Sequence, residues 1–179
     1  MSTRSSSDLT HQEVNFSAED EVVLVVPNFS LQQVHLLGGT YGPFRPQIQA
    51  AVPLWFATIL KKQGKCCIIP PMWLNVNALR TVIETERVDD VFQGLPFHYI
   101  ELAAELCKHA RDDMIDWSRL YDLVDTIRSV RHVKIQSGLR GLNADALKGV
   151  KLRHLSAIEV NVLRPFMSSV VDHFLNCFK

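Results

Sequence analysis

The chain has 179 residues, a length that fits one domain or two small ones. Apolar residues make up 47% of it and charged residues 21%, so it can bury a core and is not disordered as a whole. Its 19 basic and 19 acidic residues give a net charge of zero. This balance argues against binding nucleic acid by bulk charge, and it favours association with other proteins.

Two kinds of targeting segment are absent from the sequence pattern. No stretch reaches the roughly 18 consecutive apolar residues that a membrane span needs. The first residues are polar and rich in serine, unlike a secretory signal, so we expect the chain to stay in the cytosol or nucleus and not to contact a membrane. Residues 1–15 are predicted to form a mobile tail.

Residues 16–71 are predicted to form a small β-rich module with one short helix. A β-branched run at 22–26 indicates a strand, and a second strand at 33–37 is expected to pair with it. The glycines and prolines of 38–46 indicate turns. Apolar residues at helical spacing over 52–60 predict the helix, with Pro53 in its first turn. A third strand at 66–69 is expected to stop at Pro70 and Pro71.

Residues 72–179 are predicted to form a helical domain. One helix is expected after an N-cap at Asn75, a second over about 97–110 and a third, long one from about Trp117. The glycines of 137–150 predict a loop, and a last helix follows, with Pro165 in its first turn or at a kink. The fold class is therefore predicted as α+β, mainly α, with the β-rich module first.

The residues that commonly carry chemistry do not stand at catalytic or metal-binding spacing. The four cysteines form no CxxC pair, and the seven histidines form no HExxH pair. An enzyme would have to join Cys66 or His35 to an acid such as Glu21, and no spacing suggests it. The sequence thus predicts no catalytic residue, no metal, no cofactor and no small-molecule substrate.

Charge is unevenly distributed along the helical domain. Residues 84–125 hold eleven acidic and four basic residues, whereas 126–154 hold seven basic residues and one acidic residue. Two interpretations stay open: solvated faces of compensating sign, or a basic stripe that meets an acidic protein or a nucleic-acid backbone. The second makes the chain a stand-alone nucleic-acid-binding module, with a stripe formed by Arg128, Arg131 and Lys134.

Each predicted helix carries an apolar stripe, and large apolar groups continue almost to residue 179. Because free chain ends fray, such groups either complete the internal core or lie in a subunit interface. The interface candidates are Leu120, Val124, Ile127, Met167, Val170, Val171, Phe174 and Phe178.

A connected series of short motifs runs from residue 25 to residue 73: VVPNFSL, LLGG, GPF, VPLW, KC and PPMW. In order and spacing this series resembles the subunit-two family of the GINS complex, the four-protein accessory of the eukaryotic replicative helicase. The segments YIEL at 99–102 and IEVN at 158–161 resemble the helical half of that family more weakly. The loop 136–152 matches nothing in the family.

The resemblance implies a non-catalytic structural subunit in the nucleus. Its expected partners are three other GINS subunits, and through them the MCM helicase ring and a RecJ-like partner; a weak DNA contact is left open. It also implies structural roles for the motif residues. We expect turns at Pro27, Asn28, Phe29, Gly38 and Gly39. We expect Pro53 in the first turn of the short helix, and Pro70 and Pro71 at the end of the third strand. From the residue pattern we expect Trp55 in the core of the short helix and Trp73 where the two domains meet.

Overall fold

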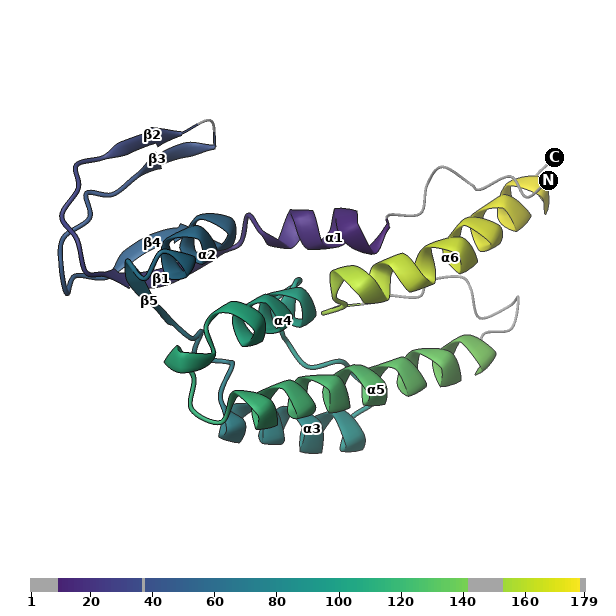
Figure 1. Ribbon diagram of the computed structural model, residues 1–179. Coiled ribbons are helices and arrows are strands. Elements are labelled where there is room, and N and C mark those ends of the chain that lie inside the picture. Colours follow the sequence, from purple (N-terminus) through teal and green to yellow (C-terminus); the bar gives the residue numbers. More distant parts are fainter. Residues whose placement is uncertain (1–9, 37, 142–152, 178–179) are drawn as a thin grey trace.

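The computed structural model describes residues 10–36, 38–141 and 153–177, and for residues 11, 140, 141 and 169–177 it describes the backbone alone. A β-rich module lies at one end and a bundle of long helices extends away from it (Figure 1). The fold is α+β, mainly α, with the β-rich module before the helical domain, as predicted. Of the described residues, none lies in a helix long and apolar enough to cross a membrane.

The central strand of the β-rich module is β1 (Val22–Pro27), and it pairs antiparallel with β4 (Ala50–Pro53) on one side and with β5 (Cys66–Ile69) on the other. Helix α2 (Leu54–Lys62) covers one face of this sheet. Pro53 was predicted in the first turn of this helix; it is the N-cap, one position before that turn. The buried side chains of the module, among them Val25, Val52 and Phe44, belong to the same core cluster as those of the helices.

The predicted pairing of the second strand with the first was wrong. Strand β2 (Val34–Leu36) pairs with β3 (Gly39–Tyr41) in a separate two-stranded hairpin that projects from the module (Figure 1). Both edges of β1 are already occupied by β4 and β5, so β2 finds no free edge there. Gly39 has φ +149°, a conformation that side chains rarely adopt, which fits its place in the turn.

The predicted tail over residues 1–15 was also wrong for its last residues. Helix α1 (His11–Ala18) is capped by Thr10. The side chain of Thr10 accepts a hydrogen bond from the backbone N–H of Glu13, and the carboxylate of Glu13 accepts one from the backbone N–H of Thr10. This capping box is a local sequence signal that the prediction of a tail overlooked. Val14 and Ala18 are buried, and α1 packs against α4 (Tyr99–His109) and α6 (Ala157–Cys177).

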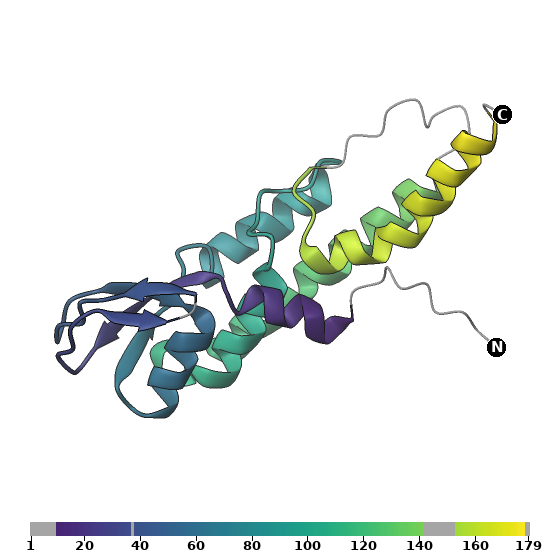
Figure 2. The ribbon, with the colours of Figure 1, turned by 90° about the horizontal axis from the view of Figure 1, so that it is seen from above.

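The other long helices are α3 (Val76–Val88) and α5 (Trp117–Gly141), which pack side by side, and a short 3-10 turn, η1 (Arg111–Asp113), precedes α5 (Figures 1 and 2). Asn75 caps α3 as predicted, because its side chain accepts a hydrogen bond from the N–H of Ala78. Helix α5 continues to Gly141, so the loop predicted from residue 137 was wrong up to that point; residues 142–152 lie outside the described residues. Pro165 lies inside α6, which is one continuous helix.

Candidate interaction surfaces

The predicted basic stripe does not exist as a surface. Arg131 is completely buried, and Lys134 is mostly buried, with 20% of its side chain exposed. Only Arg128 is exposed, at 53% of its side chain, beside Asp125. The helical spacing was predicted correctly, but the residues facing Arg131 and Lys134 across the bundle could not be seen from one helix alone.

Arg131 lies instead at the centre of a buried ionic cluster formed by Glu86, Arg131, Lys134 and Glu159. Its Nη1 is 3.7 Å from Glu86 Oε1 and its Nε is 3.0 Å from Glu159 Oε1. Lys134 Nζ is 2.6 Å from Glu86 Oε2. Two cations and two anions give the cluster no net charge, and it joins α3, α5 and α6.

Further contacts fix the cluster in place. Arg131 Nη2 donates a hydrogen bond to the carbonyl oxygen of His154, and Lys134 Nζ donates one to the carbonyl oxygen of Asp89. The guanidinium also lies over the rings of Phe92 and Tyr99, at 5.0 and 5.6 Å from their centroids. Burial raises the pKa of the Tyr99 hydroxyl, which therefore stays neutral. These groups hold the bundle together and are not available to an external polyanion.

The interface candidates separate into three groups. Leu120, Val124 and Ile127 are at most 5% exposed and belong to the core cluster, so the prediction that they form an interface was wrong. Met167 is 38% exposed on α6. The side chains of Val170, Val171 and Phe174 and all of Phe178 lie outside the described residues.

The motif residues lie mainly in turns of the β-rich module. Pro27 ends β1, and the side-chain amide of Asn28 donates a hydrogen bond to the carbonyl oxygen of Gly64. The ring of Phe29 packs on that of Phe44 with centroids 5.5 Å apart. Trp73 is partly buried against the core.

Trp55 departs from its predicted place in the core. It is only half-buried, with its ring beside that of Phe56, because the buried face of α2 is formed by Leu54, Ala57, Thr58 and Leu60.

Charged groups fasten the β-rich module to the helical domain. Lys61 of α2 is 2.7 Å from Asp113, and the other oxygen of Asp113 accepts a hydrogen bond of 2.7 Å from the N–H of Ile68 in β5. Glu21 Oε1 is 2.8 Å from His98 Nδ1. Nothing local in the sequence indicates this partner of Asp113, which lies 52 residues away along the chain.

Replacing Asp113 with Ala is expected to lower the free energy of unfolding by about 2–3 kcal/mol, because it leaves Lys61 and the N–H of Ile68 without their partner. Chemical denaturation measures the loss. Asp112→Ala is the matched control. Asp112 is the preceding residue and is exposed, so we expect the free energy of unfolding to change by no more than about 0.5 kcal/mol. Equal effects of the two substitutions would contradict the assignment.

The same ion pair has a defined pH dependence. Burial acts to lower the pKa of Lys61, but the hydrogen bond and charge of Asp113 outweigh it, so the pKa lies above its ordinary value. The contribution to stability is therefore complete below about pH 10, near the pKa of an unfolded lysine, and is lost as the pH rises through the raised pKa.

The groups considered for catalysis are not brought together. His35 Nδ1 lies 2.8 Å from the hydroxyl of Thr40 in the projecting hairpin, whereas Glu21 binds His98. Cys66 is buried, and burial raises the pKa of its thiol to about 11, which makes it a poor nucleophile. Among the described residues no group of three His, Cys, Asp or Glu side chains could hold a metal ion.

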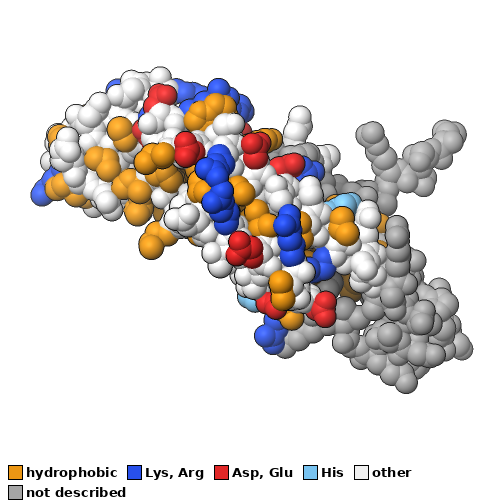
Figure 3. All heavy atoms as spheres, turned by 90° about the horizontal axis from the view of Figure 1, so that it is seen from below, with side chains coloured by type: hydrophobic (Ala, Val, Ile, Leu, Met, Phe, Trp, Pro, Cys, Tyr) orange, Lys and Arg blue, Asp and Glu red, His pale blue; other side chains and the backbone are white. Residues whose placement is uncertain are grey.

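One face of the three-stranded sheet is apolar and uncovered. The inner face packs under α2, whereas the strand residues that alternate with it on the outer face are apolar, and most of them are exposed. Val22 and Leu24 are 68% and 43% exposed there. Ala51 and Ile69 lie opposite Leu24 on the two neighbouring strands, and Cys67 lies opposite Val26. In the view from below, hydrophobic side chains gather over the β-rich module, while charged ones alternate over the helices (Figure 3). Apolar sheet faces are usually buried, so this one is a candidate interface.

Comparison with known proteins agrees with this two-part organisation. A family model described as the GINS complex protein helical bundle domain matches residues 73–178, so the helical part has the architecture of GINS subunits. A second model, the PSF2 N-terminal domain, matches residues 10–69.

Curated relatives match along nearly the whole chain. The DNA replication complex GINS protein PSF2 of Xenopus laevis is 37% identical over 90% of this chain and 88% of its own length. The proteins of the same name from Homo sapiens and Candida albicans are 34% and 36% identical, over 90% and 92% of this chain and 88% and 81% of their own lengths. The chain therefore belongs to the PSF2 family of GINS proteins.

Proposed function

We propose that this chain is a non-catalytic structural subunit of a heterotetrameric GINS complex in the nucleus. In that role it binds three other GINS subunits. The assembled complex joins the MCM motor ring and a RecJ-like partner to form the active helicase for initiation and elongation of DNA replication. Membership of the PSF2 family supports the proposal, since its relatives carry the names of replication complex proteins.

The uncovered sheet face is the observation that carries the proposal. Its exposed side chains are apolar and already rigid, because β1 is hydrogen-bonded on both edges. A protein surface that matches it gains the free energy of apolar burial and loses little conformational entropy on binding. Nucleic acid gains no charge contact from the strand residues described on this face, since none of them is a cation. The burial of Arg131 and Lys134 removes the main support for a separate nucleic-acid-binding function.

Co-expression with the three partner subunits tests the assignment. We expect the chain alone to aggregate and the four chains together to give a soluble complex of one copy each, as measured by native mass spectrometry. A well-behaved monomer with a cooperative thermal transition would count against the proposal.

A substitution on the sheet face tests the surface itself. Leu24→Glu places a carboxylate in the apolar face and is expected to reduce recovery of the complex about tenfold or more. Gln63→Glu, at an exposed position after α2, is the control and should leave recovery unchanged. Normal assembly of the Leu24→Glu variant would show that this face is not an interface.

A further inference from the structure

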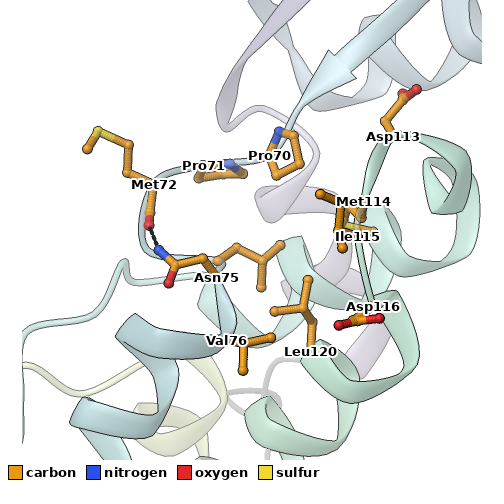
Figure 4. A pocket seen from close by; sticks show the side chains of 11 residues that line it. Pro70, Pro71, Met72, Asn75, Val76, Asp113, Met114, Ile115, Asp116 and Leu120 are labelled. Atoms are coloured by element: carbon orange, nitrogen blue, oxygen red, sulfur yellow. Dashed lines mark hydrogen bonds between the residues drawn. The ribbon is translucent and has the colours of Figure 1, made fainter.

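A hollow of about 410 Å³ opens where the segment after β5 meets the segment before α5. Its floor is formed by Leu74, Met114 and Leu120, which belong to the core. Pro70, Pro71 and Val76 line one wall, and Ile115 and Asp116 line the other (Figure 4). The hollow thus lies at the junction of the β-rich module and the helical domain.

Two side chains of this hollow are exposed to an unusual degree. Met72 is 92% exposed and Ile115 is 88% exposed, the two highest values among the large hydrophobic side chains of the described residues. Met72 points outward from the rim in Figure 4. Exposed hydrophobic residues scattered singly are ordinary, but here the two extremes border one concave site.

The walls are held rigidly, so the exposure is built into the fold. Leu74 N–H donates a hydrogen bond to the carbonyl oxygen of Pro71, and the side chain of Asn75 donates one of 2.6 Å to the carbonyl oxygen of Met72. On the other wall, Asp113 is bound to Lys61 and to the backbone of β5. A site fixed in this way loses little entropy when a ligand enters.

The charge of the hollow indicates what enters it. The charged side chains that line it are carboxylates, Asp113 and Asp116. Asp113 is neutralised by Lys61, whereas Asp116 is exposed and forms no ion pair within the described residues. Of the two cations nearest along the chain, Arg119 is exposed and forms no ion pair with Asp116. The other, Arg111, is stacked on Trp117 at 4.3 Å and donates to the carbonyl oxygen of Cys107. The site therefore combines an apolar cavity with a carboxylate at its edge that has no ion-pair partner among the described residues.

We propose that this hollow is a docking site for a short segment of another protein, one that inserts a large apolar side chain and places a lysine or arginine beside Asp116. Its volume fits a few side chains, whereas a subunit interface covers roughly 800 Å² on each partner. The site therefore differs from the sheet face, and it goes beyond the role of the chain as a subunit. The flexible thioether of Met72 suits the rim of such a site because it can close over the inserted side chain.

Fluorescence polarisation with labelled nonapeptides tests the proposal, on the chain in whichever assembly it purifies with. The probes share a central Leu, flanked by Lys, by Ser or by Glu. We expect the Lys-flanked peptide to bind about tenfold more tightly than the Glu-flanked one, with the difference reduced at high salt. Equal binding of the two, or no binding, overturns the proposal.

Matched variants locate the binding. Ile115→Ser is expected to weaken the Lys-flanked peptide about tenfold, whereas Val88→Ser, at a position 84% exposed outside the hollow, should not change it. Asp116→Asn should remove the preference for Lys over Glu, and Asp112→Asn should retain it. All four positions are exposed, so thermal unfolding should be unchanged. The proposal is rejected if Ile115→Ser abolishes assembly, which would assign the hollow to a subunit, or if it abolishes binding to a labelled oligonucleotide.

Discussion

Replacing Arg131 with Met is expected to destabilise the chain by about 3–5 kcal/mol, the largest effect we expect from any single substitution at a charged residue. The guanidinium is fully buried between two carboxylates, those of Glu86 and Glu159. Its removal leaves the buried carboxylate of Glu159 without a cation, whereas Glu86 keeps its pair with Lys134. Pulse proteolysis in urea measures the loss, and it can follow this chain even inside a complex.

Two controls separate the charge from the loss of packing. Arg128→Ala removes an exposed guanidinium from the same helix, 3.8 Å from Asp125, and should change stability by no more than about 0.5 kcal/mol. Combining Arg131→Met with Glu159→Gln removes the carboxylate that has lost its cation, leaves the Glu86–Lys134 pair intact, and should recover much of the lost stability. If the double variant is as unstable as the single one, the effect does not arise from uncompensated charge.

Ile127→Ala is expected to cost about 2–5 kcal/mol in the free energy of unfolding, through lost apolar burial and the cavity left behind. Ile127 is completely buried on α5, in the core that this helix shares with α3 and α4. Urea denaturation followed by far-ultraviolet circular dichroism measures the loss. Val133→Ala, on the same helix at a position 65% exposed, should remain within about 0.5 kcal/mol of the unchanged chain.

Comparing Ile127→Ala with Val133→Ala also decides whether the apolar residues of α5 lie in the internal core or in a subunit interface. A core residue lowers the stability of the chain itself when it is truncated. An interface residue leaves that stability unchanged and weakens assembly instead. If Ile127→Ala leaves the free energy of unfolding unchanged, Ile127 belongs to a subunit interface and not to the core.

The elements that could be predicted from sequence are those specified by local patterns. The β-branched run of β1 and the N-cap at Asn75 depend on neighbours along the chain, and both are where the sequence placed them. The capping box at Thr10 was equally local and was overlooked. The pairing of β2 was a different kind of error, because the competition of β4 and β5 for the edges of β1 is a tertiary effect.

The candidate surfaces were harder to predict, because helical spacing says which residues share a face but not what that face meets. Arg128, Arg131 and Lys134 share a face, yet Arg131 and Lys134 meet Glu86 of another helix. An acidic residue from the segment 84–125 thus neutralises basic residues from the segment 126–154 inside the bundle. The sheet face and the hollow were missed for the same reason, since each is assembled from segments that are distant along the chain.

Helix α1 has a consequence for how the two parts of the chain can move. It precedes the β-rich module in the sequence but packs against α4 and α6 of the helical domain. The module is therefore tethered at both of its ends, by α1 before it and by the segment that enters α3 after it. A single linker permits a hinge, whereas two anchored ends, together with Lys61–Asp113 and Glu21–His98, oppose rotation. A force applied to the β-rich module is therefore transmitted to the helical domain, with little rotation between the two.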